Sequence, residues 1–258
     1  MPHLSPMPTL FVGHGSPMNA IEDNPFTAAW RQAAAQLPRP RAILCISAHW
    51  QTAGTAVATT ATPTTIHDFY GFPDELYRVS YPAPGAPELA ARVTELLGTA
   101  VRSDDDWGLD HGSWSVLRHM FPEAQIPVVQ LSLDHRLPPR KHYALARRLQ
   151  PLREEDVLVL GSGNLVHNLP LIRWDDPAPY PWAESFDRQA AARIAAGDHD
   201  LLIDYPLLGK EATLAVPTNE HYLPLLYALA LQRPGESCSF FAEGLVYASL
   251  SMRSVRIG

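Results

Sequence analysis

The stretch AILCISAHW, Ala42–Trp50, holds two features that decide the fold of this 258-residue chain. Its first part is almost continuously apolar, which is typical of a strand buried on both faces of a parallel sheet. A histidine, His49, follows where that strand would end. A second run, VLVL at Val157–Leu160, is apolar throughout and is followed by glycines. Its short length favours a buried strand, although periodicity alone does not separate it from a buried helix.

Short apolar runs alternate with longer amphipathic ones along most of the chain. The predicted strands are Thr9–Val12, Ala42–Ala48, Thr55–Thr60, Pro127–Leu131, Val157–Leu160, Thr213–Val216 and Cys238–Ala242, and the predicted helices are Pro25–Gln36, Pro87–Leu97, Ser113–Met120, Pro139–Leu149, Trp182–Ala196 and Tyr222–Leu231. This alternation predicts an α/β fold with a central, mostly parallel sheet and helices on both faces. No segment has the composition of an interdomain linker, so we expect residues 1–258 to form a single domain.

Composition and charge exclude several classes of protein. The net charge is −7 and no cluster of Lys and Arg is dense, which argues against a nucleic-acid partner. No apolar run reaches the ~18 residues of a membrane span, and the first residues lack the pattern of a signal peptide. The two cysteines, Cys45 and Cys238, are too few for a disulfide framework. We therefore expect a cytoplasmic protein, either a monomer or a homo-oligomer.

Three histidines follow predicted strands. His14 follows the first strand in FVGHGSP, His49 follows AILCIS, and His167 follows VLVL in GSGNLVHN. The carboxyl ends of parallel strands meet at one edge of a sheet, where ligands gather in such folds. Because imidazole is the commonest metal-binding side chain, the sequence predicts a metal site at this edge. Taken singly, each histidine could equally be a loop or capping residue.

A fourth candidate ligand, His221, lies in VPTNEHYLPLLYALAL, just before an apolar helix. Thr218 and Asn219 are typical N-cap residues, and Pro224 suits a first helical turn. We therefore expect His221 near a helix N-terminus. The positive end of the helix dipole disfavours imidazolium there and leaves the ring able to donate a lone pair.

The segment DHGSW predicts an acid–base position. Asp110 could orient His111, and Trp114 could form a flat wall beside an aromatic substrate. The alternative is a helix start capped by Ser113, with His111 purely local. The aromatic motif HDFYGFP, which begins at His67, could line a pocket for a flat ring or be core beneath a loop. The remaining histidines are interpreted as surface or structural residues: His3, His119, His135, His142 and His199.

In this order, the motifs GHGSPMNAI, SAHW, HDFYGFP, DHGSW, GSGNLVH and EHYLPLLYALA resemble those of the LigB-type class III extradiol ring-cleavage dioxygenases, in particular the 4,5-DOPA extradiol dioxygenase family. The resemblance runs from about Thr9 to the C-terminus. It implies one LigB-like α/β domain that holds one divalent metal ion, Fe(II) for activity or Zn(II) as bound. It also implies that a small catechol and O2 react to give a muconic semialdehyde.

The resemblance also assigns residues. His14, His49 and His221 match metal ligands, His167 matches a base or extra ligand within reach of the metal, and His111 matches a histidine that helps to handle substrate and oxygen. The protocatechuate branch has a glutamate where this chain has His221. Its neighbour Glu220 is expected to point elsewhere, because adjacent side chains on a helix diverge. An all-imidazole site suits zinc as well as iron.

Three other functions are weighed against ring cleavage. Zn²⁺ on the same ligands could activate water for hydrolysis, or the chain could bind metal without catalysis. A serine hydrolase is a weaker alternative, because Ser16 and Ser162 lie outside a GxSxG elbow. The resemblance favours the dioxygenase.

Overall fold

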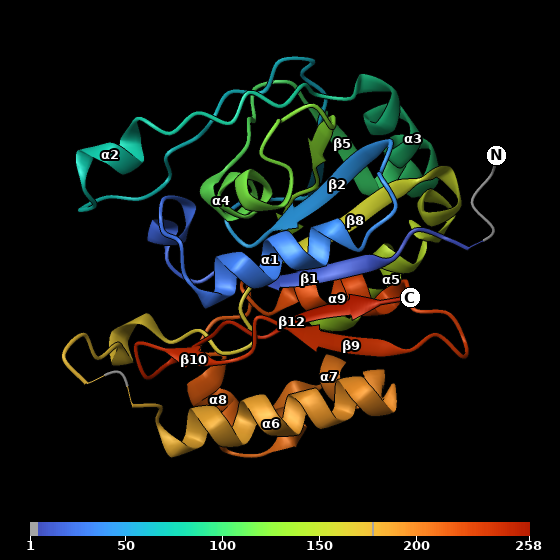
Figure 1. Ribbon diagram of the computed structural model, residues 1–258. Coiled ribbons are helices and arrows are strands. Elements are labelled where there is room, and N and C mark those ends of the chain that lie inside the picture. The colour runs from blue at the N-terminus through green and yellow to red at the C-terminus, as the bar shows by residue number, and fades with distance from the viewer. Residues whose placement is uncertain (1–4, 177) are drawn as a thin grey trace.

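A six-stranded mixed sheet forms the centre of the computed structural model, which describes residues 5–176 and 178–258 (Figure 1). Its strand order is β6-β2-β8-β1-β12-β9. The strands are β1 (Thr9–Gly13), β2 (Ala42–Ser47), β6 (Val128–Gln130), β8 (Val157–Gly163), β9 (Cys238–Phe241) and β12 (Ser254–Ile257). The first four run parallel, whereas β12 is antiparallel to both β1 and β9. The prediction of a mostly parallel sheet in a single α/β domain is confirmed.

Helices and small sheets surround this centre. The helices are α1 (Pro25–Ala35), α2 (Asp74–Tyr77), α3 (Pro87–Leu97), α4 (His111–Met120), α5 (Pro139–Arg147), α6 (Pro181–Ala196), α7 (His199–Ile203), α8 (Glu211–Ala215) and α9 (Leu223–Ala230). Three strand pairs stand apart from the main sheet: β3 (Gln51–Thr52) with β7 (Leu133–Asp134), β4 (Thr55–Ala58) with β5 (Val101–Asp104), and β10 (Leu245–Val246) with β11 (Leu250–Ser251).

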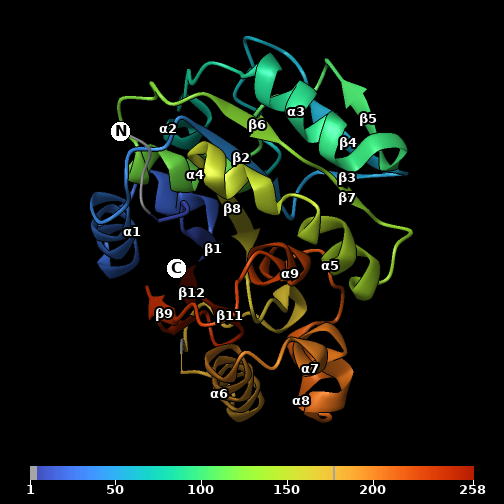
Figure 2. The ribbon, with the colours of Figure 1, turned by 90° about the vertical axis from the view of Figure 1, so that its right-hand side faces the viewer.

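Alternate side chains of the strands enter two different cores. Ile43 and Cys45 of β2 pack in the core that includes Trp30 of α1 and Trp114 of α4. Their neighbour Leu44 packs in the core that contains the apolar side chains of α5 and α9. Figure 2 shows α1 and α4 on one side of the sheet and α5 and α9 on the other. Burying an apolar side chain of this size stabilises the fold by about 1.5–3 kcal/mol, so helices packed on both faces of the sheet contribute to stability. The sheet is buried on both faces, as predicted.

The predicted strand at Thr213–Val216 is wrong, since these residues belong mainly to the short helix α8. Ala212 and Ala215, three positions apart, are buried beside α6, whereas Leu214 is exposed. A run of four residues, three of them apolar, is too short for its period to separate a strand from one helical turn. The sequence also failed to indicate β12, whose four residues include the polar Arg256 and yet pair with two other strands.

Further expectations concern the membrane and the cysteines. In the two described ranges no helix has the length and apolar character needed to span a bilayer. Cys45 is buried in β2 and Cys238 half-buried in β9, and both thiols are free. His3 lies outside the described residues.

Candidate metal centre and active site

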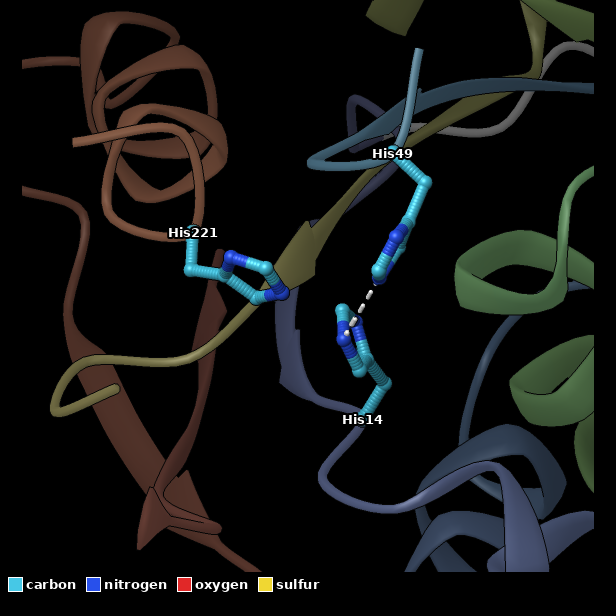
Figure 3. Close-up of side chains that lie close together, drawn as sticks. All are labelled: His14, His49 and His221. Atoms are coloured by element: carbon cyan, nitrogen blue, oxygen red, sulfur yellow. Dashed lines mark hydrogen bonds between the residues drawn. The ribbon is translucent and has the colours of Figure 1, made fainter. Parts of the chain in front are cut away.

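Three histidines converge at the carboxyl edge of the parallel strands (Figure 3). His14 directly follows β1, His49 lies just after β2, and His221 lies just before α9. One ring nitrogen of each lies within 4.8 Å of those of the other two. Nε2 of His14 and Nε2 of His49 are 3.2 Å apart, and the ring of His221 points toward them. In the sequence, His14 and His49 are 35 positions apart, and His49 and His221 are 172 positions apart. The three histidines meet because the two strands and the helix beside them have their ends at the same edge of the sheet.

A glycine allows these chain segments to approach. The backbone N–H of His14 donates to the carbonyl of Gly163 at 3.0 Å, and the N–H of Asn164 donates to the carbonyl of His221 at 2.9 Å. A Cβ at Gly163 would lie only 2.1 Å from the His221 carbonyl oxygen, so only glycine fits between β8 and the segment before α9. The end of β8 therefore sets the separation of His14 and His221.

The outward nitrogen of His14 is held by a serine. Ser162 Oγ lies 2.9 Å from Nδ1 of His14 and donates its only hydrogen to the carbonyl of Gly112. The serine must therefore accept from His14, which places the ring proton on Nδ1. Nε2 of His14 is left with its lone pair directed at the meeting point.

Carboxylates hold the other two outward nitrogens. Nδ1 of His49 lies 3.5 Å from Asp68 Oδ2, and Nδ1 of His221 lies 3.2 Å from Glu220 Oε1. Because an ionised carboxylate only accepts hydrogen bonds, the ring of His221 carries its proton on Nδ1, and the negative charge of Asp68 near Nδ1 of His49 favours the same tautomer there. The expectation that Glu220 and His221 point apart is wrong, because these residues lie in the turn before α9 and not on the helix.

Burial keeps the three rings neutral. Desolvation, and then the nearby histidines, hold the pKa values of His14 and His221 well below the usual range. Burial and His111 do the same for the pKa of His49, against the opposing influence of Asp68. A neutral imidazole with its proton on Nδ1 is the form that binds a metal through Nε2.

This donor set fits one divalent cation. Two lone pairs that face each other at 3.2 Å repel unless a proton or a cation lies between them. Two nitrogens bonded to one zinc ion at about 2.0–2.1 Å, at a tetrahedral angle, would lie about 3.4 Å apart. The separation and the tautomers both agree with His14, His49 and His221 as ligands of one ion.

His167 lies beside this trio and stacks on one member. The rings of His167 and His221 are nearly parallel, with centroids 3.4 Å apart and planes inclined by 7°. A nitrogen of His167 lies close to ligand atoms of Glu220 and His221, but it does not belong to the group formed by His14, His49 and His221, nor to a third group formed by His49, Asp68 and His111. Burial, with His111 second, lowers the pKa of His167 to about 4, so this ring is neutral at pH 7.

His111 opens α4, with its ring centroid 3.9 Å from that of His49. The helix is capped by Asp110, whose carboxylate accepts from the N–H of Ser113 at 3.0 Å, so Ser113 is not the cap. Nor does Asp110 orient His111, because Asp68 occupies that place. Oδ1 of Asp68 accepts from the backbone N–H of His111 at 2.8 Å and lies 3.0 Å from Nδ1 of its ring.

Sequence reasoning missed Asp68. The residue is the second in HDFYGFP, where the aromatic neighbours drew the interpretation toward a hydrophobic pocket. The feature that could have indicated Asp68 is its carboxylate, directly after His67 in a motif that resembles one of the extradiol dioxygenase family. Contacts with His111 and His49 outweigh burial and hold the pKa of the Asp68 carboxyl below its usual value, so the group is a carboxylate at neutral pH.

The aromatic residues near the site differ in burial: one lies beside His111, others pack in the core and one is on the surface. Phe69 is half-buried with its ring edge-on to His111 at 5.5 Å. Trp114 is fully buried behind it and donates from Nε1 to the Ile66 carbonyl, so the expected wall is not Trp114. Phe72 packs on Phe69 as core, whereas Tyr70 is 92% exposed.

Some side chains of the site are partly exposed to solvent. The side chains of His49, Asp68 and Glu220 are 19%, 21% and 18% exposed, whereas His14 is 1% exposed. A small molecule would therefore approach past Asp68 and Glu220. The described histidines interpreted as surface or structural residues lie elsewhere: His119, His142 and His199 bond to neighbouring groups, and His135 is exposed, as predicted.

Comparisons with known proteins agree with this geometry. A family model described as the catalytic LigB subunit of aromatic ring-opening dioxygenase matches residues 1–253. The chain is 48% identical over 258 residues to a 4,5-DOPA dioxygenase extradiol of Escherichia coli (strain K12), covering 98% of this chain and 95% of that protein. It is 40% identical over 229 residues to a protein of the same name from Beta vulgaris, covering 86% and 85%.

A solved structure is similar as well. The crystal structure of an uncharacterized protein from Escherichia coli K12 has a TM-score of 0.86 and 45% identity, over 98% of this chain and 100% of that one. The chain belongs to the LigB family of aromatic ring-opening dioxygenases and is an extradiol enzyme of that family.

Proposed function

We propose that the enzyme opens the ring of a DOPA-like catechol with O2 at one metal ion held by His14, His49 and His221, and releases a muconic semialdehyde. The convergence of three Nε2 lone pairs on one point carries this proposal. The names of the relatives, 4,5-DOPA dioxygenase extradiol, support the substrate class. When bound, Fe(II) supplies the electron transfer between substrate and O2 that redox-inert Zn(II) does not.

The chain orients the substrate. Two of the proposed ligands follow strands and the third lies in the turn before α9, and a catechol approaches them past the partly exposed side chains of Asp68 and Glu220. Phe69, beside His111, offers an apolar edge for the ring.

His167 is the proposed base. Its neutral ring, stacked on His221, can take the proton of a catechol hydroxyl as that oxygen approaches the metal. A catecholate is richer in electrons than a catechol, which favours reaction with oxygen. In this role His167 acts on the substrate and is not one of the three ligands that hold the metal.

His111 is the proposed acid. It lies next to His49, and Asp68 contacts both its backbone and its ring. A ring placed there can deliver a proton to an oxygen that leaves as the product forms. Protein groups thus move protons at two places, one on each side of the metal ligands.

Two alternatives remain as rivals because the all-imidazole donor set also suits zinc. A zinc hydrolase would activate water at the same ligands and consume no O2. A metal-binding protein without catalysis would show neither reaction.

An oxygen electrode separates these functions. Protein loaded anaerobically with Fe(II) is mixed with a panel of catechols that includes L-DOPA, and a Zn(II)-loaded sample is the control. The proposal predicts catechol-dependent uptake of O2 with a new yellow chromophore in the iron sample alone. No uptake with any catechol, despite stoichiometric iron, would contradict the proposal and favour one of the rivals.

We further infer that residues 1–258 act as one catalytic domain in the cytoplasm on a small molecule and not on nucleic acid. Strands of one sheet lead to His14, His49 and His167, and the net charge is −7. The free thiols of Cys45 and Cys238 agree with a reducing compartment.

A further inference from the structure

Asp68 contacts two different histidines with one carboxylate. Oδ1 accepts from the backbone N–H of His111 at 2.8 Å and lies 3.0 Å from Nδ1 of the same ring. Oδ2 lies 3.5 Å from Nδ1 of His49. The two rings are themselves adjacent, with centroids 3.9 Å apart. A single group therefore touches both a candidate metal ligand and the candidate acid.

The segment that carries Asp68 lies outside the main sheet. Residues 60–85 connect β4 to α3 and contain only the short helix α2, which marks the tip of this segment in Figure 1. Their burial is mostly low, yet the stretch beside the site is anchored. Ile66 donates to the Leu109 carbonyl at 2.7 Å, Leu109 donates to the Thr64 carbonyl at 2.8 Å, and Trp114 Nε1 donates to the Ile66 carbonyl at 2.8 Å.

Contacts of its two neighbours in the sequence also fix the position of the Asp68 carboxylate. The carbonyl of Val79 lies 3.0 Å from Nε2 of His67, which fixes the residue before Asp68 from the other side of the segment. Phe69, the residue after it, packs against Tyr77 of α2 and against His111. Asp68 is thus held between two anchored neighbours, and its position does not depend on the sheet.

The contact with His49 acts on the metal site. The negative charge of Asp68, 3.5 Å from Nδ1 of His49, favours the tautomer with its proton on that nitrogen, whose Nε2 lone pair faces His14 and His221. Such outer partners orient a histidine ligand and raise its basicity, and their loss typically costs 10–100-fold in metal affinity.

The contacts with His111 act on the acid. The bond to its backbone fixes the first residue of α4, and the carboxylate oxygen 3.0 Å from Nδ1 fixes the orientation of the ring. Losing the charge would weaken the hold on the ring orientation without moving the helix, since an amide oxygen could still accept the backbone bond.

We propose that Asp68 is a positioning residue that couples the 60–85 segment to both halves of the chemistry: it sets the orientation of His49 toward the metal and of His111 toward the substrate. The second half rests on the proposed function, because it takes His111 as the acid. The first half concerns metal binding alone and can be tested whether or not a catechol is turned over.

Asp68→Asn is the central variant, because it keeps the shape and an oxygen for the backbone N–H of His111 while removing the charge. Zn(II) affinity is measured by competition with a chromophoric chelator, and kcat and KM are measured on the Fe(II)-loaded protein. We expect Zn(II) to bind about 10–100-fold more weakly and kcat to fall, with a smaller change in KM. Asp74→Asn, an exposed aspartate in α2 of the same segment, is the matched control and should leave all three unchanged.

A double-mutant cycle separates the two effects. In a His111→Ala background, Asp68→Asn should still weaken Zn(II) binding, through His49, but should lower kcat little further. If Asp68 were only structural, its effect on kcat would persist undiminished in that background, which would overturn the coupling. Unchanged Zn(II) affinity in Asp68→Asn would overturn the contact with His49.

A measurement on the unaltered protein guards against a variant that fails to fold. Nitrogen-15 NMR of the histidine rings in metal-free protein should show the proton of His49 on Nδ1. A proton on Nε2 would contradict the proposed role of Asp68. If no catechol is consumed even by the iron-loaded wild type, the proposed function fails, whereas the Zn(II) and NMR results still decide the role of Asp68 at the metal site.

Discussion

The two edges of the central sheet each hold a buried polar cluster, and the clusters differ in kind. At the amino edge, Arg153 is fully buried and donates to the carbonyls of Met7 and Leu231, both at 2.6 Å, and to both carboxylate oxygens of Glu236. Donors and acceptors match within that cluster. At the carboxyl edge, the histidine nitrogens that face inward are all acceptors.

This difference separates a structural polar cluster from a functional one. A buried charge whose hydrogen bonds are all made within the protein adds stability or specificity and asks for no partner. A set of lone pairs that converge on one point is stable only when a cation joins them. Burial alone does not distinguish the two edges, because both are deeply buried; the balance of donors and acceptors does.

The largest expected effect comes from the carboxyl edge. His14→Ala removes one of three converging nitrogens, and we expect metal affinity to fall by more than about 100-fold, beyond the loss typical of an outer partner. Turnover should vanish with the metal. Metal content after dialysis, measured by atomic emission, checks this result, and full metal content in the variant would contradict the assignment of His14.

A second variant at the same edge should behave differently. His167→Ala should keep much more metal than His14→Ala yet lose about 10²–10⁴-fold in kcat, because it removes the proposed base and none of the three ligands. Metal content and oxygen uptake are measured on the same sample. Equal and complete loss of metal in both variants would make His167 a necessary part of the metal site and not a base.

At the amino edge, Arg153→Met should lower the free energy of unfolding by about 3–5 kcal/mol, because Glu236 and two carbonyls lose their donor. Metal affinity should not change. Urea unfolding of the metal-free protein measures the loss. Arg102→Met, which breaks an exposed pair with Asp104, is the control and should cost less than about 1 kcal/mol. An equal decrease in the free energy of unfolding in both variants would show that the buried Arg153 contributes no more to stability than an exposed arginine.

The smallest expected effect is in the pH dependence of metal binding. Protons compete with a metal only below the pKa of the ligand rings, and burial holds the pKa values of His14, His49 and His221 well below the usual range. Zn(II) affinity should therefore change little between about pH 8 and pH 6.5, the ordinary histidine value. Titrations in zinc buffers check this. A tenfold loss per pH unit across that range would contradict neutral, buried ligands.

Much of the carboxyl edge was predictable from sequence, because the signal is local. His14 and His49 stand directly after apolar strands, and the carboxyl ends of parallel strands coincide whatever the loops do. His221 was predicted near a helix start, although neither Thr218 nor Asn219 caps α9 with its side chain. The order of the motifs along the chain then identified the family.

The outward partners were not predictable in the same way. Asp68 reaches His49 and His111 from an irregular segment, where no periodicity says which way a side chain points. Glu220 contacts its own neighbour because the chain turns before α9, and helix spacing does not apply there. The error at Thr213–Val216 has the same origin, since a few apolar residues fit both periods. Long regular elements were therefore predicted well, and turns and short segments were not.

The effect of Zn(II) on the free energy of unfolding tests most directly whether His14, His49 and His221 hold a metal ion. A cation that binds only the folded protein raises its free energy of unfolding by about 2.7 kcal/mol at a free concentration of 100 times Kd. We expect this increment with Zn(II) for the wild type, the same increment for Arg153→Met, and none for His14→Ala. An increment that persists undiminished in His14→Ala, or that is absent from the wild type, would show that the histidines at the carboxyl edge do not hold the metal.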